Sequence, residues 1–60
     1  MTYRIITNHG TVDFAANLEI AELKYLKYVK DMIDGYSSFV RLILVDTDSN
    51  KEICIREIAA

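Results

Sequence analysis

Four oxygen-bearing side chains near the C-terminal end of the sequence have the spacing of a calcium-binding loop. They fall at positions one, three, five and twelve of such a loop, and they are Asp46, Asp48, Asn50 and Glu57. Position six is normally glycine because the chain turns sharply there, but here it is Lys51, a cation. Aspartate, serine and asparagine are also ordinary hairpin-turn residues. We therefore expect a turn over 46–51 and keep calcium as a minor alternative, with no other metal and no cofactor.

Nucleophilic or acid–base chemistry would depend on His9 and Cys54, each the sole residue of its kind. A single histidine and a single cysteine exclude a zinc cage of such ligands, and a lone cysteine excludes an intrachain disulfide. A dyad of the two would need a turn and a strand to meet in space, which the sequence does not indicate. There is also no phosphate loop and no nucleophile elbow. We predict that the chain is not an enzyme and has no catalytic residue.

Hydrophobic periodicity predicts a strand, a short strand, a helix and a final hairpin. The ranges are 3–7, 11–14, 18–34 and 39–58, with the hairpin turn at 46–51. Asn17 is a good N-cap for the helix, and Gly35 suits the position just past its end. The pattern predicts one α+β domain over residues 1–60. We expect a β(β)αββ fold, with a three- to four-stranded sheet, antiparallel or mixed, and one helix packed on one face.

The opening residues MTYRI and the order hairpin, helix, hairpin resemble the immunoglobulin-binding domains of protein G. The resemblance implies this architecture and no function. FVRLILV stands where those domains have a strand with tryptophan, and the helix does not share their binding pattern.

The predicted helix has one broad apolar stripe that spans about 160° at 100° per residue. The stripe consists of Leu18, Ala21, Tyr25, Leu26, Tyr28, Val29, Met32 and Ile33. Glu22 lies within this arc, either at its edge with the carboxylate in water or paired with an arginine. Ile20 and Leu23 lie among the charged residues of the opposite side, either as ordinary surface aliphatics or as part of a contact with a second chain. Glu22, Ile20 and Leu23 are therefore candidates for a secondary interface.

The two strands of the final hairpin are apolar on both faces of the predicted sheet. If Val45 lies opposite Glu52, regular alternation places one wholly apolar set under the helix, namely Val40, Leu42, Leu44, Ile53 and Ile55. The other face receives Phe39, Arg41, Ile43, Val45, Cys54, Arg56 and Ile58, and Arg4 and Ile6 of the first strand join it. All three arginines then share one face, with Arg41 opposite Arg56, a like-charge pair that needs a neutralising group. Glu52 could supply this group within the chain, and an acidic partner surface or a phosphate could supply it from outside.

Arginine interleaved with aliphatic and aromatic residues is typical of protein interfaces. The predicted interface consists of Arg4, Ile6, Phe39, Arg41, Ile43, Arg56 and Ile58. The alternative is a solvated face on which the arginine stems cover the aliphatic side chains.

Composition limits the class of partner. The chain has 60 residues and is 52% hydrophobic. Its net charge of −2 argues against broad nucleic-acid binding, which needs a basic surface. A chain this small buries only about 60% of the surface that it exposes when unfolded, so spare apolar residues favour oligomerisation. No apolar run approaches the roughly 18 residues of a membrane helix, and no signal peptide is recognisable. A lone thiol favours the cytoplasm.

We therefore predict a small protein–protein interaction module that acts without chemistry, as a regulator, adaptor or inhibitor. Its partner would be another protein or a second copy, and we expect a homodimer. Compact chains of this kind are common among phage and mobile-element accessory proteins. The alternative is a nucleic-acid-binding regulator that uses the three arginines, although Phe39 is the only stacking aromatic expected on that face.

Overall fold

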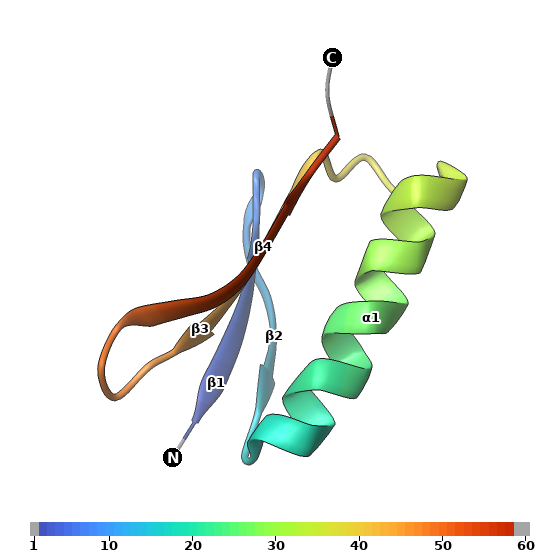
Figure 1. The fold of residues 1–60 in the computed structure, drawn as a ribbon. Coiled ribbons are helices and arrows are strands. Elements are labelled where there is room, and N and C mark those ends of the chain that lie inside the picture. The colour runs from blue at the N-terminus through green and yellow to red at the C-terminus, as the bar shows by residue number, and fades with distance from the viewer. Residues whose placement is uncertain (1, 59–60) are drawn as a thin grey trace.

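A computed structural model describes residues 2–58, which form one four-stranded sheet and one helix (Figure 1). In chain order the elements are β1 (Tyr3–Thr7), β2 (Gly10–Ala15), α1 (Leu18–Asp34), β3 (Arg41–Asp46) and β4 (Lys51–Glu57). The sheet is open, its strand order is β2-β1-β3-β4, and every neighbouring pair is antiparallel. The predicted α+β fold with ββαββ order is confirmed. Within residues 2–58, no helix has the length and apolar character needed to cross a membrane.

The ends of α1 are where the sequence places them, because capping groups satisfy the free backbone atoms. Asn17 Oδ1 accepts a hydrogen bond from the Ile20 N–H at 2.9 Å. Gly35 has a φ of 78°, a left-handed conformation that glycine adopts without steric cost. The Gly35 N–H donates to the Met32 carbonyl and the Tyr36 N–H to the Asp31 carbonyl, which is the Schellman pattern of helix termination.

The core lies between α1 and the inner face of the two central strands. Ile5 of β1 and Leu42 and Leu44 of β3 are fully buried there. From α1 they receive Ala21, Tyr25, Val29 and Met32, all buried. The Tyr25 hydroxyl donates to the Leu42 carbonyl at 3.0 Å, so the polar end of this core side chain is satisfied.

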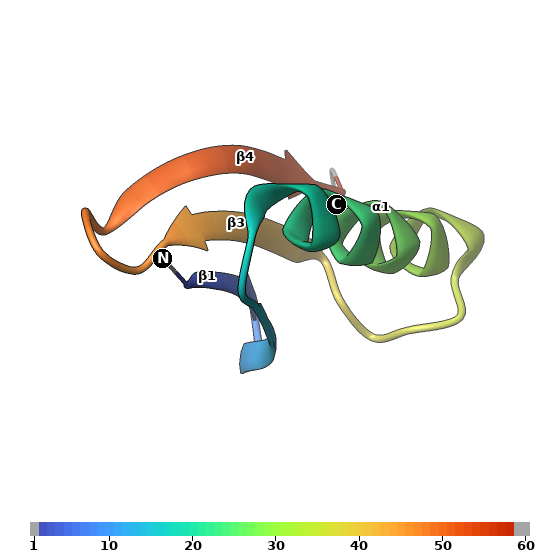
Figure 2. The same cartoon turned by 90° about the horizontal axis from the view of Figure 1, so that it is seen from below.

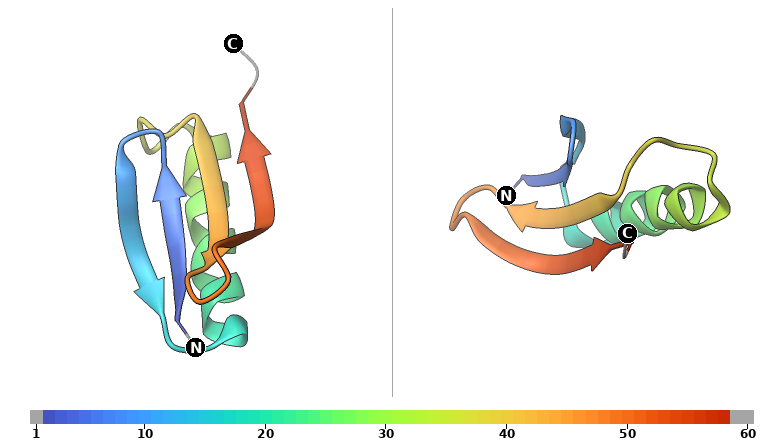
Figure 3. Two further views of the ribbon diagram at one scale, coloured as in Figure 1. Left: turned by 90° about the vertical axis from the view of Figure 1, so that its left-hand side faces the viewer. Right: turned by 90° about the horizontal axis from the view of Figure 1, so that it is seen from above.

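The helix covers only one face of the sheet. Figure 3 shows the strands in front of α1, with nothing from the described chain in front of them. The turn between β3 and β4 also projects away from the helix (Figures 1 and 2). We call the side toward α1 the inner face and the uncovered side the outer face.

The β3–β4 hairpin begins in the predicted register and then departs from it. Next to the turn, Asp46 lies opposite Lys51 and Val45 opposite Glu52, as expected. The register then shifts, so that Leu44 lies opposite Cys54 and Ile53 has no partner on β3. Such a β-bulge inserts one extra residue into one strand. A one-residue shift moves every later side chain of that strand to the other face.

The bulge makes part of the predicted face assignment wrong. Leu42 and Leu44 do lie under the helix, but Ile53 and Ile55 are exposed, and so is Val40, which precedes β3. Ile55 pairs with Ile43 on the outer face, whereas Cys54 and Arg56 pair with Leu44 and Leu42 on the inner face. The predicted pairs Ile43–Cys54 and Arg41–Arg56 do not form.

Replacing Asn17 with alanine removes the N-cap acceptor of α1. We expect Asn17→Ala to lower the free energy of unfolding by about 1 kcal/mol, measured by urea denaturation followed by circular dichroism. Asn17→Ser is the matched control, because serine restores a capping oxygen and should keep most of the stability. Equal stability of the wild type and Asn17→Ala would contradict the role of this cap.

Candidate functional site

Three isoleucines lie side by side across the outer face. Ile6 of β1 lies opposite Ile43 of β3, and Ile43 lies opposite Ile55 of β4. Directly opposite residues of antiparallel strands have Cβ atoms about 5 Å apart, so these side chains form one continuous apolar strip. We call it the isoleucine row. Ile55 at its end is 53% exposed.

A second row runs beside it and contains a half-buried arginine. Phe14 of β2 lies opposite Arg4, and Arg4 lies opposite Val45. Val45 is only 4% exposed although it does not belong to the core cluster, whereas Phe14 is 56% exposed. The Arg4 Nε is buried without a hydrogen-bond partner among residues 2–58. Polar atoms in this position are uncommon in native proteins and often mark a site that another group completes.

Arg41 is neutralised within the chain, unlike the prediction that it faces Arg56. It lies opposite Glu57, and its Nε is 3.2 Å from Glu57 Oε1. Both side chains are more than half exposed, so the ion pair contributes little to stability. Its effect is on the charge of the outer face, where Arg4 and Arg41 are balanced by Glu52 and Glu57.

The outer face therefore brings together four of the seven predicted interface residues, namely Arg4, Ile6, Arg41 and Ile43. Arg56 lies on the inner face because of the bulge. Ile58 follows β4 and donates its N–H to the Val40 carbonyl. Phe39 precedes β3, and its ring lies 6.0 Å from that of His9 and 6.2 Å from that of Tyr28 on α1. Phe39 is thus packed at the end of the sheet instead of lying on the outer face.

Ile55 and Phe14 are outer-face residues that sequence reasoning missed. For Phe14 there was no signal beyond its place in a short strand. For Ile55 there was one, because regular alternation forced Arg41 opposite Arg56, which destabilises a sheet. A shift by one residue replaces this like-charge pair with Arg41 and Glu57.

A groove of about 420 Å³ separates α1 from β4 on the inner side of the sheet. Its residues are Glu22, Tyr25, Leu26 and Val29 from α1 and Cys54, Ile55 and Arg56 from β4. Glu22 and Arg56 line the groove from opposite elements, and no ion pair joins them within the described chain. Burial raises the pKa of the Tyr25 hydroxyl, with a further contribution from Cys54, while Arg56 opposes the rise.

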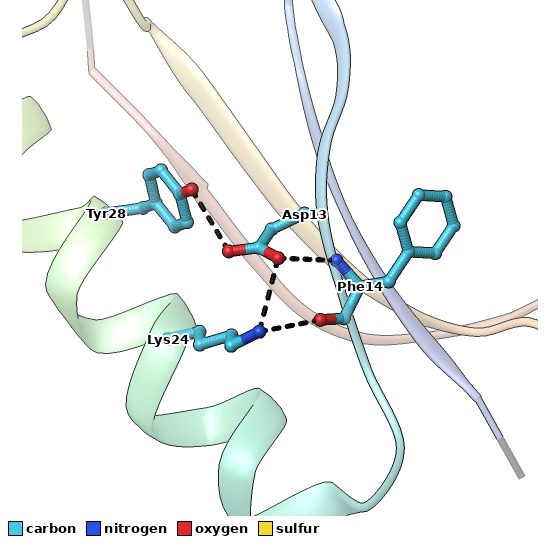
Figure 4. Close-up of polar contacts among 4 residues, drawn as sticks. All are labelled: Asp13, Phe14, Lys24 and Tyr28. Atoms are coloured by element: carbon cyan, nitrogen blue, oxygen red, sulfur yellow. Dashed lines mark hydrogen bonds and ion pairs between the residues drawn. The ribbon is translucent and has the colours of Figure 1, made fainter.

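The other flank of α1 carries a polar cluster (Figure 4), beside a smaller hollow of about 300 Å³ that Lys27 and Asp31 also line. Asp13 Oδ1 accepts from the Phe14 N–H at 2.8 Å and from Lys24 Nζ at 3.3 Å, and Oδ2 accepts from the Tyr28 hydroxyl at 3.2 Å. Lys24 Nζ also donates to the Phe14 carbonyl at 2.9 Å. These contacts tie α1 to β2.

The cluster shifts two ionisable groups. The Phe14 N–H is the main cause that lowers the pKa of the Asp13 carboxyl; partial burial opposes it, and Lys24 and Tyr28 assist it. Burial raises the pKa of the Tyr28 hydroxyl, and its hydrogen bond to Asp13 adds to the rise.

The remaining candidates do not converge on a site. Asp46 ends β3, and Asp48 and Asn50 lie in the turn that follows. Glu57 is at the far end of β4, about 20 Å away at 3.3 Å per residue. Among residues 2–58 no three histidine, cysteine, aspartate or glutamate side chains come together as a metal site would require. The His9 ring contacts Asn8 and Ser38, whereas Cys54 lines the groove. Ile20 and Leu23, the secondary candidates, are exposed on α1.

The sequence matches no family model, and no curated protein or solved structure is significantly similar to it. The functional argument therefore depends on the geometry of this chain alone.

The Asp13 carboxylate should make stability depend on acid pH. Since its pKa is lower in the folded chain than the ordinary value of about 3.9, its contribution is present above that value and is lost as the pH falls through the folded pKa. We expect Asp13→Asn to lose less stability than the wild type between pH 5 and pH 2, measured as the urea midpoint at each pH. Asp48→Asn, the same change in the exposed turn, should retain the wild-type dependence. Parallel curves for the wild type and Asp13→Asn would exclude this role.

Proposed function

We propose that the protein is a homodimeric protein-interaction module that acts without chemistry, as a regulator, adaptor or inhibitor. The observation that carries the proposal is the isoleucine row on the uncovered face of the sheet. A contiguous apolar strip at the surface marks a contact site more often than free surface. Two sheets that pack face to face lie about 10 Å apart and bury such rows between them.

A second copy of this chain fits the outer face for two reasons. In a two-fold contact the same residues meet from both sides, and an apolar row is complementary to itself. The charges that flank it also cancel, since Arg4 and Arg41 are matched by Glu52 and Glu57. In an antiparallel arrangement the Arg4 guanidinium of one copy is free to reach a carboxylate of the other, which would give its buried Nε a partner.

The same balance of charge supports a protein partner over a nucleic acid. A nucleic-acid-binding face needs uncompensated positive charge and exposed aromatic rings. Here Arg41 is paired with Glu57 and Arg56 lies on the inner face. Phe39 packs against His9 and Tyr28, so Phe14 is the exposed ring that the outer face offers for stacking. We place the protein in the cytoplasm, where the lone Cys54 would remain reduced.

The apolar character of the isoleucine row can be reduced without losing the β-strand propensity of its residues. The double variant Ile6→Thr/Ile43→Thr keeps a β-branched side chain at each position. We expect the homodimer to dissociate on the order of a hundredfold more readily, because four apolar side chains leave the interface of each dimer. Light scattering on a sizing column over a range of concentrations measures this change, and circular dichroism checks that the monomer is folded.

The matched control is Ile20→Thr/Ile33→Thr, which makes the same exchange at two exposed positions of α1. It should dimerise like the wild type. A wild-type mass near 6.9 kDa at all concentrations would overturn the proposal. So would a dimer that is unaffected by the double variant on the sheet.

A further inference from the structure

The free edge of β4 presents backbone groups that no strand of the described chain pairs. β4 is the last strand of the sheet, and its only neighbour is β3. The Ile58 N–H donates to the Val40 carbonyl at 2.9 Å, which sets the alternation of the hydrogen bonds along this ladder. By this alternation the backbone N–H and C=O groups of Arg56 point toward β3. The same groups of Ile55 and Glu57 point away from β3, toward solvent.

The groove beside this edge is open because α1 covers the sheet unevenly. On the β2 side, hydrogen bonds from Lys24 and Tyr28 to Asp13 bridge helix and sheet (Figure 4), beside a smaller hollow of about 300 Å³. On the β4 side no such contact exists within residues 2–58, and Leu26 on the wall of the groove is 62% exposed. Tyr25, Val29 and Cys54 continue the apolar lining inward.

Two opposite charges line this groove, Glu22 from α1 and Arg56 from β4, and no ion pair joins them within residues 2–58. Arg56 is the charge on the strand whose outward backbone groups are free. Its side chain lies on the inner face, opposite Leu42 and close enough to Tyr25 to influence the hydroxyl. No carboxylate of the described chain lies within ion-pair distance of it, in contrast to Arg41 with Glu57 on the outer face. A cation without a partner, beside unpaired backbone groups and an apolar wall, favours a ligand with a carboxylate, a backbone and apolar side chains.

We propose that an extended, acidic peptide segment of another protein binds here as a fifth strand along β4. Its backbone would pair with Ile55 and Glu57, and alternate side chains would enter the groove against Leu26 and Val29. A glutamate or aspartate between these apolar residues meets Arg56. This inference goes beyond the proposed dimer, because it uses the edge and the inner side of the sheet. The two surfaces share Ile55, whose backbone would pair with the peptide and whose side chain belongs to the isoleucine row.

A second copy of this chain is a poorer occupant of the same edge. Two antiparallel β4 strands that pair through Ile55 and Glu57 place Arg56 directly opposite Arg56 of the other copy, a like-charge contact. The bulge at Ile53 also interrupts regular pairing toward the turn, a device that protects sheet edges from self-association.

The test uses two fluorescein-labelled peptides that differ in one residue. The probe named acidic for its single Glu is Thr-Ile-Lys-Glu-Val-Val-Thr. As an antiparallel strand with Glu opposite Arg56, it places Glu, the Ile at its second position and the Val at its sixth position on the groove side. The basic probe has Lys in place of that Glu. Fluorescence anisotropy at low salt should show that the wild-type chain binds the acidic probe about tenfold more tightly than the basic probe.

Arg56→Glu should reverse this preference, and Leu26→Ala should weaken the binding of both probes. Lys27→Glu is the control, since it makes the same charge change on α1 outside the groove. Amide NMR shifts on adding the acidic probe should be largest at Ile55 and Glu57 and small at Ile6 and Ile43.

Three results would overturn the inference. They are no binding of either probe at millimolar concentration, a preference that Arg56→Glu leaves unchanged, and amide shifts confined to the outer face. If the amide NMR shifts of β4 change with protein concentration in the absence of peptide, a second copy occupies this edge. That result would also overturn the inference. The dimer mass, measured on the same samples, reports on the isoleucine row separately.

Discussion

The β-bulge at Ile53 determines which side chains of β4 each face of the sheet receives. Before the bulge, Val45 and Glu52 are in the register that the turn imposes; after it, every residue of β4 is displaced by one. Because side chains alternate along a strand, this displacement exchanges the two faces of residues 54–57. Ile55 therefore completes the isoleucine row, Glu57 meets Arg41, and Arg56 moves under the sheet. Without the extra residue, Arg41 and Arg56 would repel each other across the hairpin.

The second constraint is that one helix is too narrow for this sheet. A helix is about 10 Å across and strands are about 4.8 Å apart, so one helix covers about two strands. α1 covers the inner face of β1 and β3, where Ile5, Leu42 and Leu44 are fully buried. The Asp13 cluster draws it toward β2, and the space over β4 is left as the groove. The same hydrogen bonds that secure one flank of the helix thus account for the opening on the other.

The two surfaces differ in chemistry and in direction. The outer face combines an apolar row with charges that cancel, which suits contact with an identical surface. The groove combines an apolar wall, a free strand edge and two opposite charges on facing walls, Glu22 and Arg56, which suits a ligand of defined polarity. A dimer joined through the outer face would present two grooves on opposite sides. This arrangement agrees with a role as an adaptor, which brings two partner segments together without acting on either.

The sequence by itself determined the type and order of the elements, and the ends of two of them. The first strand and the helix were predicted at their observed bounds, because hydrophobic periodicity, Asn17 and Gly35 act within a few residues of one another. It also determined the inner face of β3, since Leu42 and Leu44 alternate without interruption. Arg4, Ile6, Arg41 and Ile43 were correctly grouped for the same reason.

Only the tertiary structure decided the face of Arg56 and Ile55, the packing of Phe39 and the existence of the groove. A bulge is a property of two paired strands, and in the run Ile53-Cys54-Ile55 an apolar residue stands on either face, so the run itself cannot report the shift. The position of the Phe39 ring depends on contacts with His9 and Tyr28. These residues are distant in sequence and meet only when the sheet and helix are assembled. The groove depends on where α1 comes to rest across the strands, and that is set by contacts between Asp13, Lys24 and Tyr28 that no local pattern encodes.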